Sequence, residues 1–331
     1  MGDAVTPPPS ADGKPIIDGG KPTGARPKIV FFGSGPVAAS SLELLLQHAT
    51  IECVVTKPQP PHHHGSFPVI ELCQRQNLKM YTPANKVELT TLVASQHLSS
   101  VLGVVIDYGI IIEQTVIDYF AHGIVNSHFS LLPALRGADP ISFAVLSGQP
   151  QTGVSLMVIT AGLDEGPILT HGTYDMPPSI TTPSLTGQLI LLSDQLLCDT
   201  LANYHAGSIT ALSQTEYAAA HGLSPQPSYS RKLTKADGHL DFNKPASVLE
   251  REIRAYLDWP RSRTTLAGKD VIITAATVLP PGPHPPSTVY VEDSNLIIAT
   301  AQGDLQIDSL QPAGKKQMTA QDFLAGHRHL L

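Results

Sequence analysis

Residues 28–36 read Lys28-Ile29-Val30-Phe31-Phe32-Gly33-Ser34-Gly35-Pro36, a run of apolar side chains that ends in a turn rich in glycine. A short continuous apolar run bounded by turn residues is typical of a strand buried on both faces. The following segment, 40–47, has leucines at helical spacing, and residues 51–56 form a second apolar run. We therefore expect a strand, a helix and a parallel strand joined by a right-handed crossover.

The same alternation continues along the chain. We expect a helix at 69–76 and further strands at 101–106 and 123–127, which together predict an α/β domain with a Rossmann-like parallel sheet. In such sheets, ligands bind beyond the carboxyl ends of the strands. This rule directs attention to the residues at those ends, which are Gly33, Thr56, Tyr108 and Asn126.

The pattern changes after about residue 214. Short β-rich segments at 271–274, 288–291, 296–300 and 305–310 are separated by Pro and Gly, which favours a small OB-like β-barrel. Residues 1–27 are rich in Pro, Gly and Asp without apolar periodicity and are expected to be disordered. The expected organisation is thus an extension at 1–27, a catalytic domain at 28–213, a linker at 214–228 and the OB-like domain at 229–331.

The composition argues against a membrane-spanning protein and against a disulfide-rich one. No run of 18 apolar residues exists, so no membrane span is expected. The three cysteines, Cys53, Cys73 and Cys198, match neither a disulfide framework nor a metal knuckle, and a reducing cytoplasm is expected. A monomer is the default expectation. The formal net charge is −7, but the range 231–269 has nine Lys and Arg against five Asp and Glu. If the protein binds a polyanion, we expect the contact at this range, although a surplus this small is also typical of a solvated surface.

The turn Gly33-Ser34-Gly35 resembles the start of a dinucleotide fingerprint, but the pattern is incomplete. Residue 38 is Ala38 where the third glycine is required, and the second strand ends Val55-Thr56-Lys57 without an acidic residue. We therefore expect no nicotinamide cofactor, and expect instead a turn that lets the backbone approach a ligand.

The richest stretch for chemistry is Asn126-Ser127-His128, and a carboxylate follows at Asp164 between Gly162 and Gly166. Asn126 and His128 are two residues apart in a strand, so their side chains point to the same face. An amide, an imidazole and a carboxylate supply an oxyanion donor, a proton shuttle and an orienting anion, as acyl transfer to an amine requires. Spacing alone also allows His128 to be an ordinary hydrogen-bonded loop residue. No Gly-x-Ser-x-Gly elbow is present, which favours direct transfer over a covalent intermediate.

Three motifs carry a resemblance to a known family. They are Asn126-Ser127-His128, Ser130-Leu131-Leu132-Pro133-x-x-Arg136-Gly137 and Leu163-Asp164-x-Gly166, and they resemble the signature of the formyltransferases that use 10-formyltetrahydrofolate. The resemblance implies a catalytic trio of Asn126, His128 and Asp164, with 10-formyltetrahydrofolate as co-substrate and no metal. It also implies folate contacts from Tyr108, Gly109, Ser130, Leu131, Leu132, Pro133, Gly162 and Leu163.

The C-terminal half narrows the resemblance. The segments Tyr229-Ser230-x-Lys232-Leu233-x-Lys235 and Leu310-Gln311-Pro312-Ala313-Gly314-Lys315-Lys316-x-Met318 are similar to those of methionyl-tRNA formyltransferases. This similarity implies an initiator methionyl-tRNA as acceptor. It implies phosphate contacts from Arg231, Lys232, Lys235, Lys315 and Lys316.

One loop departs from that group. Residues 59–67, Gln59-Pro60-Pro61-His62-His63-His64-Gly65-Ser66-Phe67, contain no Lys or Arg, whereas the corresponding loop of the relatives is usually longer and basic. The difference leaves open an amino-sugar formyltransferase or a catalytically inactive RNA-binding relative. Three adjacent histidines could bind a transition metal, but no carboxylate or thiolate accompanies them, and we expect a solvated loop.

Overall fold

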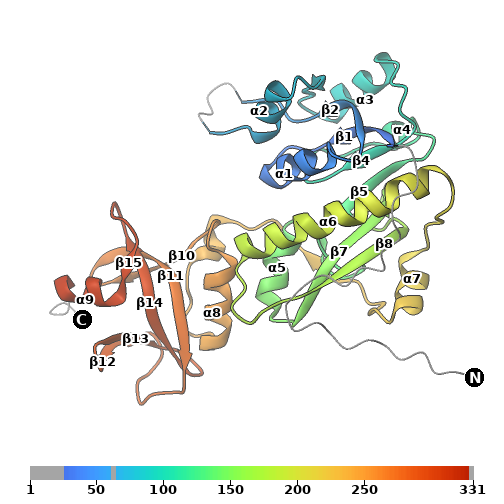
Figure 1. Cartoon of the computed structure of the whole chain (residues 1–331). Coiled ribbons are helices and arrows are strands. Elements are labelled where there is room, and N and C mark those ends of the chain that lie inside the picture. The colour runs from blue at the N-terminus through green and yellow to red at the C-terminus, as the bar shows by residue number, and fades with distance from the viewer. Residues whose placement is uncertain (1–25, 61–64, 328–331) are drawn as a thin grey trace, which may run out of the picture. The chain divides into compact units, whose positions relative to one another are not determined.

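The computed structural model describes residues 26–60 and 65–327, in two compact units (Figure 1). The expected disorder of residues 1–27 therefore lies, up to residue 25, outside the described residues, as do His62, His63 and His64 of the loop. The first unit includes the described residues up to Gly137, with Gln151–Met176 and Thr186–Tyr229, and the second includes Ala138–Pro150, Pro177–Leu185 and the described residues from Ser230 onward.

A twisted sheet with helices forms the first unit. Among the described residues its strand order is β3-β2-β1-β4-β5-β7-β8. The strands are β1 (Lys28–Phe32), β2 (Thr50–Val55), β3 (Met80–Tyr81), β4 (Gly103–Val105), β5 (Ile124–His128), β7 (Gln151–Val158) and β8 (Ile168–Asp175). The helices are α1 (Pro36–Leu45), α2 (Pro68–Arg75), α3 (Lys86–Ser95), α4 (Gln114–Ile117), most of α6 (Thr182–His205) and α7 (Gln214–His221).

The first five strands in this order are parallel, which confirms the Rossmann-like expectation. The sheet is mixed at one edge, because β7 is antiparallel to both β5 and β8. A parallel partner would require a crossover back to the start of the sheet. Here β7 and β8 instead form a hairpin, and the loop between them carries Asp164.

Large apolar side chains of the strands pack on the faces of the sheet in the first unit. Phe32 is fully buried and makes an edge-to-face contact with Phe120, with ring centroids 6.0 Å apart. On the α6 side, a Cβ on Gly172 of β8 would lie 2.7 Å from Leu192, so glycine allows the helix to approach the strand closely. Ser127 and Ser193 form a buried hydrogen bond of 2.6 Å between β5 and α6. These contacts hold β5, which carries Asn126 and His128, between well-packed layers.

The second unit is built on an antiparallel sheet, as the β-rich C-terminal pattern predicts. Its order among the described residues is β10-β11-β14-β13-β12, and β15 pairs with β14. The strands are β10 (Ser262–Leu266), β11 (Lys269–Leu279), β12 (Val289–Glu292), β13 (Asn295–Ala299), β14 (Asp304–Pro312) and β15 (Met318–Thr319). Helix α8 (Ala246–Ala255) packs on β11, and α9 (Ala320–His327) packs on β13 and β14.

Two segments from the range 28–213 belong to this second unit. Helix α5 (Pro140–Ser147) packs against α8, and Arg251 donates a hydrogen bond of 3.1 Å to the carbonyl of Leu146. Arg254 donates a hydrogen bond of 2.7 Å to the carbonyl of Ile180. The chain therefore enters the second unit twice before residue 230.

The range 214–228, expected to be a linker, begins with helix α7 instead. Ser213 caps this helix by accepting a hydrogen bond from the backbone of Glu216, and the Glu216 side chain accepts from the backbone of Ser213. The Ser-x-x-Glu pattern of this capping box is visible in the sequence. The remaining short elements are β6 (Arg136–Gly137), β9 (Tyr229–Ser230) and a 3₁₀ turn at Lys235–Gly238.

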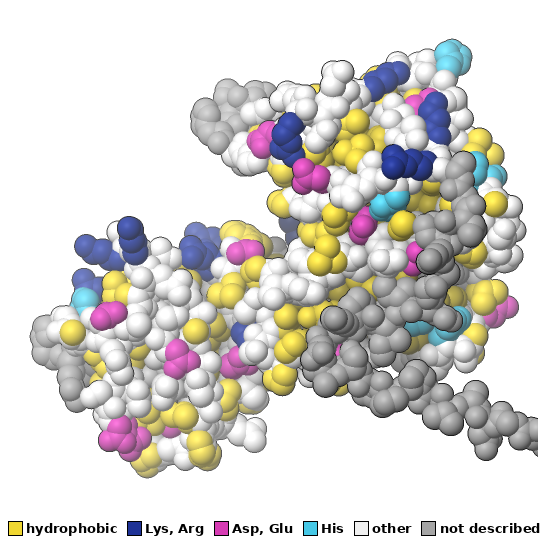
Figure 2. All heavy atoms as spheres, in the orientation of Figure 1, with side chains coloured by type: hydrophobic (Ala, Val, Ile, Leu, Met, Phe, Trp, Pro, Cys, Tyr) yellow, Lys and Arg dark blue, Asp and Glu magenta, His cyan; other side chains and the backbone are white. Residues whose placement is uncertain are grey.

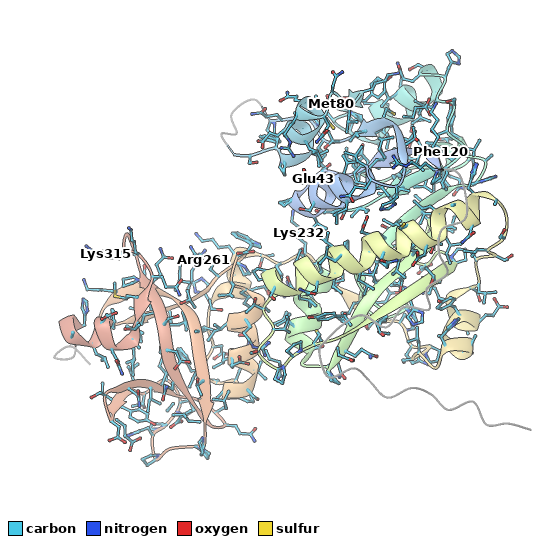
Figure 3. The ribbon with its side chains drawn as sticks, viewed as in Figure 1. Glu43, Met80, Phe120, Lys232, Arg261 and Lys315 are labelled. Atoms are coloured by element: carbon cyan, nitrogen blue, oxygen red, sulfur yellow. The ribbon has the colours of Figure 1, made fainter. Side chains whose placement is uncertain are left out.

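Lys and Arg side chains gather along one side of the second unit (Figure 2). Figure 3 places Lys232, Arg261 and Lys315 on this side. Arg261 donates a hydrogen bond of 2.9 Å to the side chain of Gln311, which donates in turn to the carbonyl of Lys315 at 2.8 Å. The other side chains predicted to contact phosphates, Arg231, Lys235 and Lys316, are also exposed. Within the described residues, no helix has the length and apolar character needed to cross a membrane.

Candidate active site

The end of β5 supplies two of the three predicted catalytic side chains. Asn126 lies between Val105 of β4 and Met157 of β7, and His128 lies opposite Ser155. His128 is 6% exposed, whereas Asn126 is half-buried, and its side-chain amide forms no hydrogen bond with any residue of the described ranges. The amide of Asn126 is therefore available to a ligand.

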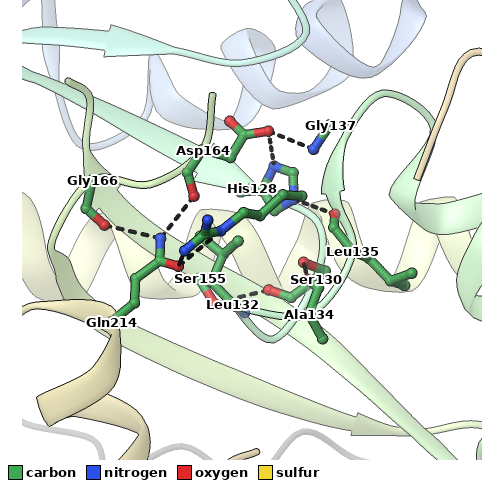
Figure 4. A network of polar contacts seen from close by, with 11 residues as sticks. His128, Ser130, Leu132, Ala134, Leu135, Gly137, Ser155, Asp164, Gly166 and Gln214 are labelled. Atoms are coloured by element: carbon green, nitrogen blue, oxygen red, sulfur yellow. Dashed lines mark hydrogen bonds and ion pairs between the residues drawn. The ribbon is translucent and has the colours of Figure 1, made fainter. Parts of the chain in front are cut away.

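The contacts of His128 assign roles to its two ring nitrogens (Figure 4). Nε2 lies 2.9 Å from the carbonyl oxygen of Leu135, which can only accept, so Nε2 carries a proton. Nδ1 lies 3.8 Å from Oδ2 of Asp164. This distance is longer than a hydrogen bond but close enough for an electrostatic interaction. Nδ1 is consequently the nitrogen that can accept a proton, and it does so facing a carboxylate.

Backbone groups fix the position of Asp164 and of the loop that carries it. The backbone N–H of Gly137 donates a hydrogen bond of 2.7 Å to Oδ2 of Asp164, and Asp164 has a left-handed conformation with φ of 50°. Two residues later, a Cβ on Gly166 would lie 1.8 Å from the carbonyl oxygen of Val158. Only glycine fits there, which gives the Asp-x-Gly spacing of the motif a steric reason.

Residues 130–133 form a tight turn fixed by Ser155. The hydroxyl of Ser155 donates to the carbonyl of Ser130 at 2.8 Å and accepts from the N–H of Leu132 at 3.0 Å. The Leu132–Pro133 peptide bond is cis. Ser130, Leu132 and Pro133 are buried and Leu131 is half-buried, so the turn presents backbone more than side chains.

The Tyr108-Gly109 turn follows β4 at the same edge of the sheet. The Tyr108 ring is buried, with its centroid 5.8 Å from that of Phe32, and burial raises the pKa of its hydroxyl. Because this ring faces the core, a ligand would meet the backbone of residues 108–109. Gly109 has φ of 67°, and a Cβ there would lie 2.6 Å from Nζ of Lys57.

A cavity of about 190 Å³ opens beyond the ends of β1 and β2. Its lining combines apolar side chains with hydroxyls and one lysine, and includes Ser34, Thr56, Lys57, Phe67 and Ile70. On the other side of β5, Gly162 and Leu163 of the Asp164 loop are exposed. The residues predicted to contact folate therefore fall into two groups. Residues 108–109 and 130–133 form turns that present backbone groups, and Gly162 and Leu163 belong to an exposed loop.

Two polar residues near the pair were not predicted as site residues. Arg136 donates to the side chain of Gln214 through Nε at 3.1 Å and Nη2 at 2.6 Å, and to Oε1 of Glu165 at 3.1 Å. Gln214 is 5% exposed and also donates to backbone carbonyls of the Asp164 loop. Arg136 belongs to a quoted motif, but no local signal in the sequence indicates the role of Gln214.

Comparison with known families gives two matches that together cover most of the chain. The model "Formyl transferase" matches residues 27–201, and "Formyl transferase, C-terminal domain" matches residues 232–328.

Curated relatives match over nearly their whole length. The chain is 37% identical over 319 residues to the methionyl-tRNA formyltransferase of Myxococcus xanthus, covering 92% of this chain and 96% of the relative. It is 35% identical over 309 residues to the enzyme of the same name from Roseiflexus castenholzii, covering 91% of this chain and 96% of the relative.

Solved structures share the fold at lower identity. An N-formyltransferase from Helicobacter canadensis, in complex with folinic acid and dTDP-3-aminofucose, has a TM-score of 0.64 at 15% identity, over 85% of this chain and 98% of that one. A sugar 3-N-formyltransferase has a TM-score of 0.64 at 17% identity, over 88% and 100% of the two chains. These likenesses concern the fold alone.

Proposed function

The chain belongs to the methionyl-tRNA formyltransferase family, and from this premise we propose that it transfers a formyl group from 10-formyltetrahydrofolate to the α-amino group of initiator methionyl-tRNA. The observation that carries the proposal within the molecule is the approach of His128 Nδ1 to 3.8 Å from Asp164 at the end of β5, two residues after Asn126, whose side-chain amide forms no hydrogen bond with the described residues. The amino-sugar alternative is less well supported, because the relatives at 35–37% identity are methionyl-tRNA formyltransferases, whereas the sugar formyltransferases share the fold at 15–17% identity.

The amine must lose a proton as its nitrogen bonds to the formyl carbon. An α-amino group has a pKa of about 7.7–8.0, so much of it is protonated at neutral pH. His128 accepts a proton at Nδ1 and later returns one to the folate nitrogen as the bond between that nitrogen and the formyl carbon breaks. Asp164 faces Nδ1 and stabilises the positive charge that develops on the ring. The transfer is then balanced without a metal or a nicotinamide.

Asn126 stabilises the oxygen of the formyl group. As the amine adds to the carbon, negative charge collects on that oxygen, and an amide N–H directed at it lowers the barrier. The side chain is half-buried and makes no hydrogen bond with the described residues, so it need not break an existing bond to donate. Loss of a comparable donor in other enzymes costs about 3–4 kcal/mol.

The residues at the edge of the sheet fit a folate ring bound mainly by backbone. The turn at Tyr108-Gly109 and the turn at 130–133 offer peptide groups, and Leu163 offers an apolar side chain that is 63% exposed. A flat heterocycle with several donors and acceptors suits such a lining.

The second unit contributes the RNA contacts in this proposal. Lys232, Lys235, Lys315 and Lys316 are exposed and carry charge suited to phosphates. Arg231 is partly engaged, because it forms an ion pair with Asp237. We expect the protein to act in the cytoplasm and as a monomer, since one chain supplies both the catalytic trio and the basic surface.

One assay tests the function. The protein is incubated with 10-formyltetrahydrofolate labelled at the formyl carbon and with charged initiator tRNA, uncharged tRNA or a nucleotide-linked amino sugar. We expect acid-stable label on the charged tRNA alone. Label on the sugar alone would overturn the proposal and favour the amino-sugar alternative, which the absence of Lys and Arg in residues 59–67 leaves open.

A further inference from the structure

We propose that Gln214 is a positioning residue of formyl transfer, whose buried side-chain amide sets the placement of Asp164 opposite His128. The inference rests on the proposed function and adds to it a residue outside the three motifs. Gln214 is the first residue of α7, 50 residues from Asp164 in sequence.

Every polar position of the Gln214 amide is used (Figure 4). Its Nε2 donates to the carbonyl of Asp164 at 2.7 Å and to the carbonyl of Gly166 at 3.0 Å. Its Oε1 accepts two hydrogen bonds from Arg136, at 2.6 and 3.1 Å. A carboxamide has two N–H groups and two acceptor positions, so this set is complete. In a side chain that is 5% exposed, each of these bonds is costly to lose.

These bonds connect Gln214 to the two segments that set the position of the Asp164 carboxylate opposite His128. Asp164 is held through its own carbonyl, while Arg136 immediately precedes Gly137, whose N–H donates to the Asp164 carboxylate. Gln214 therefore binds the main chain that bears the carboxylate directly, and it contacts the segment that orients the carboxylate through the Arg136 side chain. A change at Gln214 can move both relative to His128.

The Asp164 loop has little packing of its own to hold it. Gly162, Leu163 and Glu165 are exposed, and Asp164 adopts a left-handed conformation. A non-glycine residue with positive φ persists when surrounding contacts hold it. The hydrogen bonds from Gln214 and from Gly137 are such contacts.

Helix α7 gives Gln214 a fixed base. Leu212 and Ile168 of β8 exchange two backbone hydrogen bonds of 2.7 and 2.9 Å just before the helix. Within α7, the Tyr217 hydroxyl lies 2.9 Å from Nδ1 of His171 on β8. The helix is thus anchored to the same strand pair from which the Asp164 loop emerges.

Two variants and one matched control test the role. Gln214→Glu keeps an acceptor for Arg136 but cannot donate to the two carbonyls, and Gln214→Met keeps the length and removes all four bonds. Because small misplacements of catalytic groups are costly, we expect kcat to fall on the order of tenfold or more in both, with KM for tRNA and folate nearly unchanged. Gln151→Glu is the matched control, because Gln151 donates a hydrogen bond of 3.0 Å to Asp175 at the end of the β7–β8 hairpin away from the Asp164 loop, so it should lower the melting temperature without lowering kcat.

A double-mutant cycle separates positioning from general stabilisation. If Gln214 acts through Asp164, then Gln214→Glu should reduce kcat little further in an Asp164→Asn background. Effects that multiply, or an unchanged kcat in Gln214→Glu, would overturn the inference. If Gln214→Met does not fold, the cycle with Gln214→Glu still decides. An inactive wild type would contradict the proposed function, whereas an active wild type with additive variants would contradict only the role of Gln214.

Discussion

At the scale of single residues, the chemistry depends on which nitrogen of His128 is free. The bond from Nε2 to Leu135 leaves Nδ1 facing Asp164, so the imidazole can take a proton from a substrate only on the side of the carboxylate. One residue of a strand and one residue of a hairpin loop meet in this arrangement. The sequence correctly paired Asn126 with His128 on one face, because strand geometry alternates every second residue.

The first prediction concerns His128 itself. His128→Ala removes the proton shuttle, and kcat should fall by about 10²–10⁴, the usual contribution of a general acid–base group. Transfer of labelled formyl to methionyl-tRNA in single-turnover conditions measures this step. His97→Asn is the control, because His97 is exposed and asparagine accepts its positive φ of 46°. A His128→Ala enzyme with wild-type turnover would contradict the assignment.

The second prediction tests the glycine after Asp164. In Gly166→Ala the new methyl group collides with the carbonyl of Val158, so the β7–β8 loop must shift. We expect a lower melting temperature together with a lower kcat. Gly187→Ala is the matched control, because nothing lies within 4 Å of that Cβ position in α6. In a helix this change should stabilise by about 0.5–1 kcal/mol. Equal melting temperatures of the two variants would refute the steric argument.

At the scale of elements, Glu52 links β2 to the segment that precedes β4. Its carboxylate accepts backbone hydrogen bonds from Ser99 at 2.9 Å and Ser100 at 2.7 Å. Burial by itself raises the pKa of this carboxyl, but the hydrogen bonds from Ser100 and Ser99 outweigh burial and lower the pKa to about 2. The interaction joins β2 across β1 to a segment whose residues lie 47 and 48 positions further along the chain.

The third prediction follows from that pKa. A carboxyl whose pKa is lower in the folded state stabilises the fold above its unfolded value of about 4.3, and this contribution is lost as pH falls towards 2. Glu52→Gln should therefore be less stable than wild type at pH 7, on the order of 2 kcal/mol, and the gap should narrow between about pH 4.5 and 2. Urea unfolding at several pH values measures it. A gap independent of pH would contradict the role of the charge.

At the scale of the whole molecule, basic side chains gather on one side of the second unit although the net charge of the chain is negative. The net charge is −7, yet Lys232, Arg261 and Lys315 lie along one side of the second unit (Figure 3). Trp259 is the only tryptophan of the chain and is 51% exposed. Its ring nitrogen lies 3.5 Å from the carbonyl of Leu233, next to Lys232. Its fluorescence therefore reports on this basic side.

The fourth prediction uses this signal. Binding of initiator tRNA should change Trp259 fluorescence, and Lys315→Ala with Lys316→Ala should weaken binding. The slope of log K against log salt should fall by about 0.7–0.9 for each phosphate that the double variant no longer neutralises. Lys86→Ala is the control, because Lys86 lies in the first unit and pairs with Glu113. An unchanged slope in the double variant would show that these lysines do not bind the RNA.

The amino-acid sequence alone determined the βαβ start of the chain, the β-rich second unit and the common face of Asn126 and His128. These features depend on residue type and on the spacing of apolar residues within a short window, so they can be recognised from a short stretch of sequence. Tertiary structure decided that β7 is antiparallel to β5 and β8, that Ala138–Pro150 belongs to the second unit, and that Gln214 donates hydrogen bonds to the Asp164 loop. Such features depend on contacts between residues tens of positions apart, for which the local pattern carries no signal.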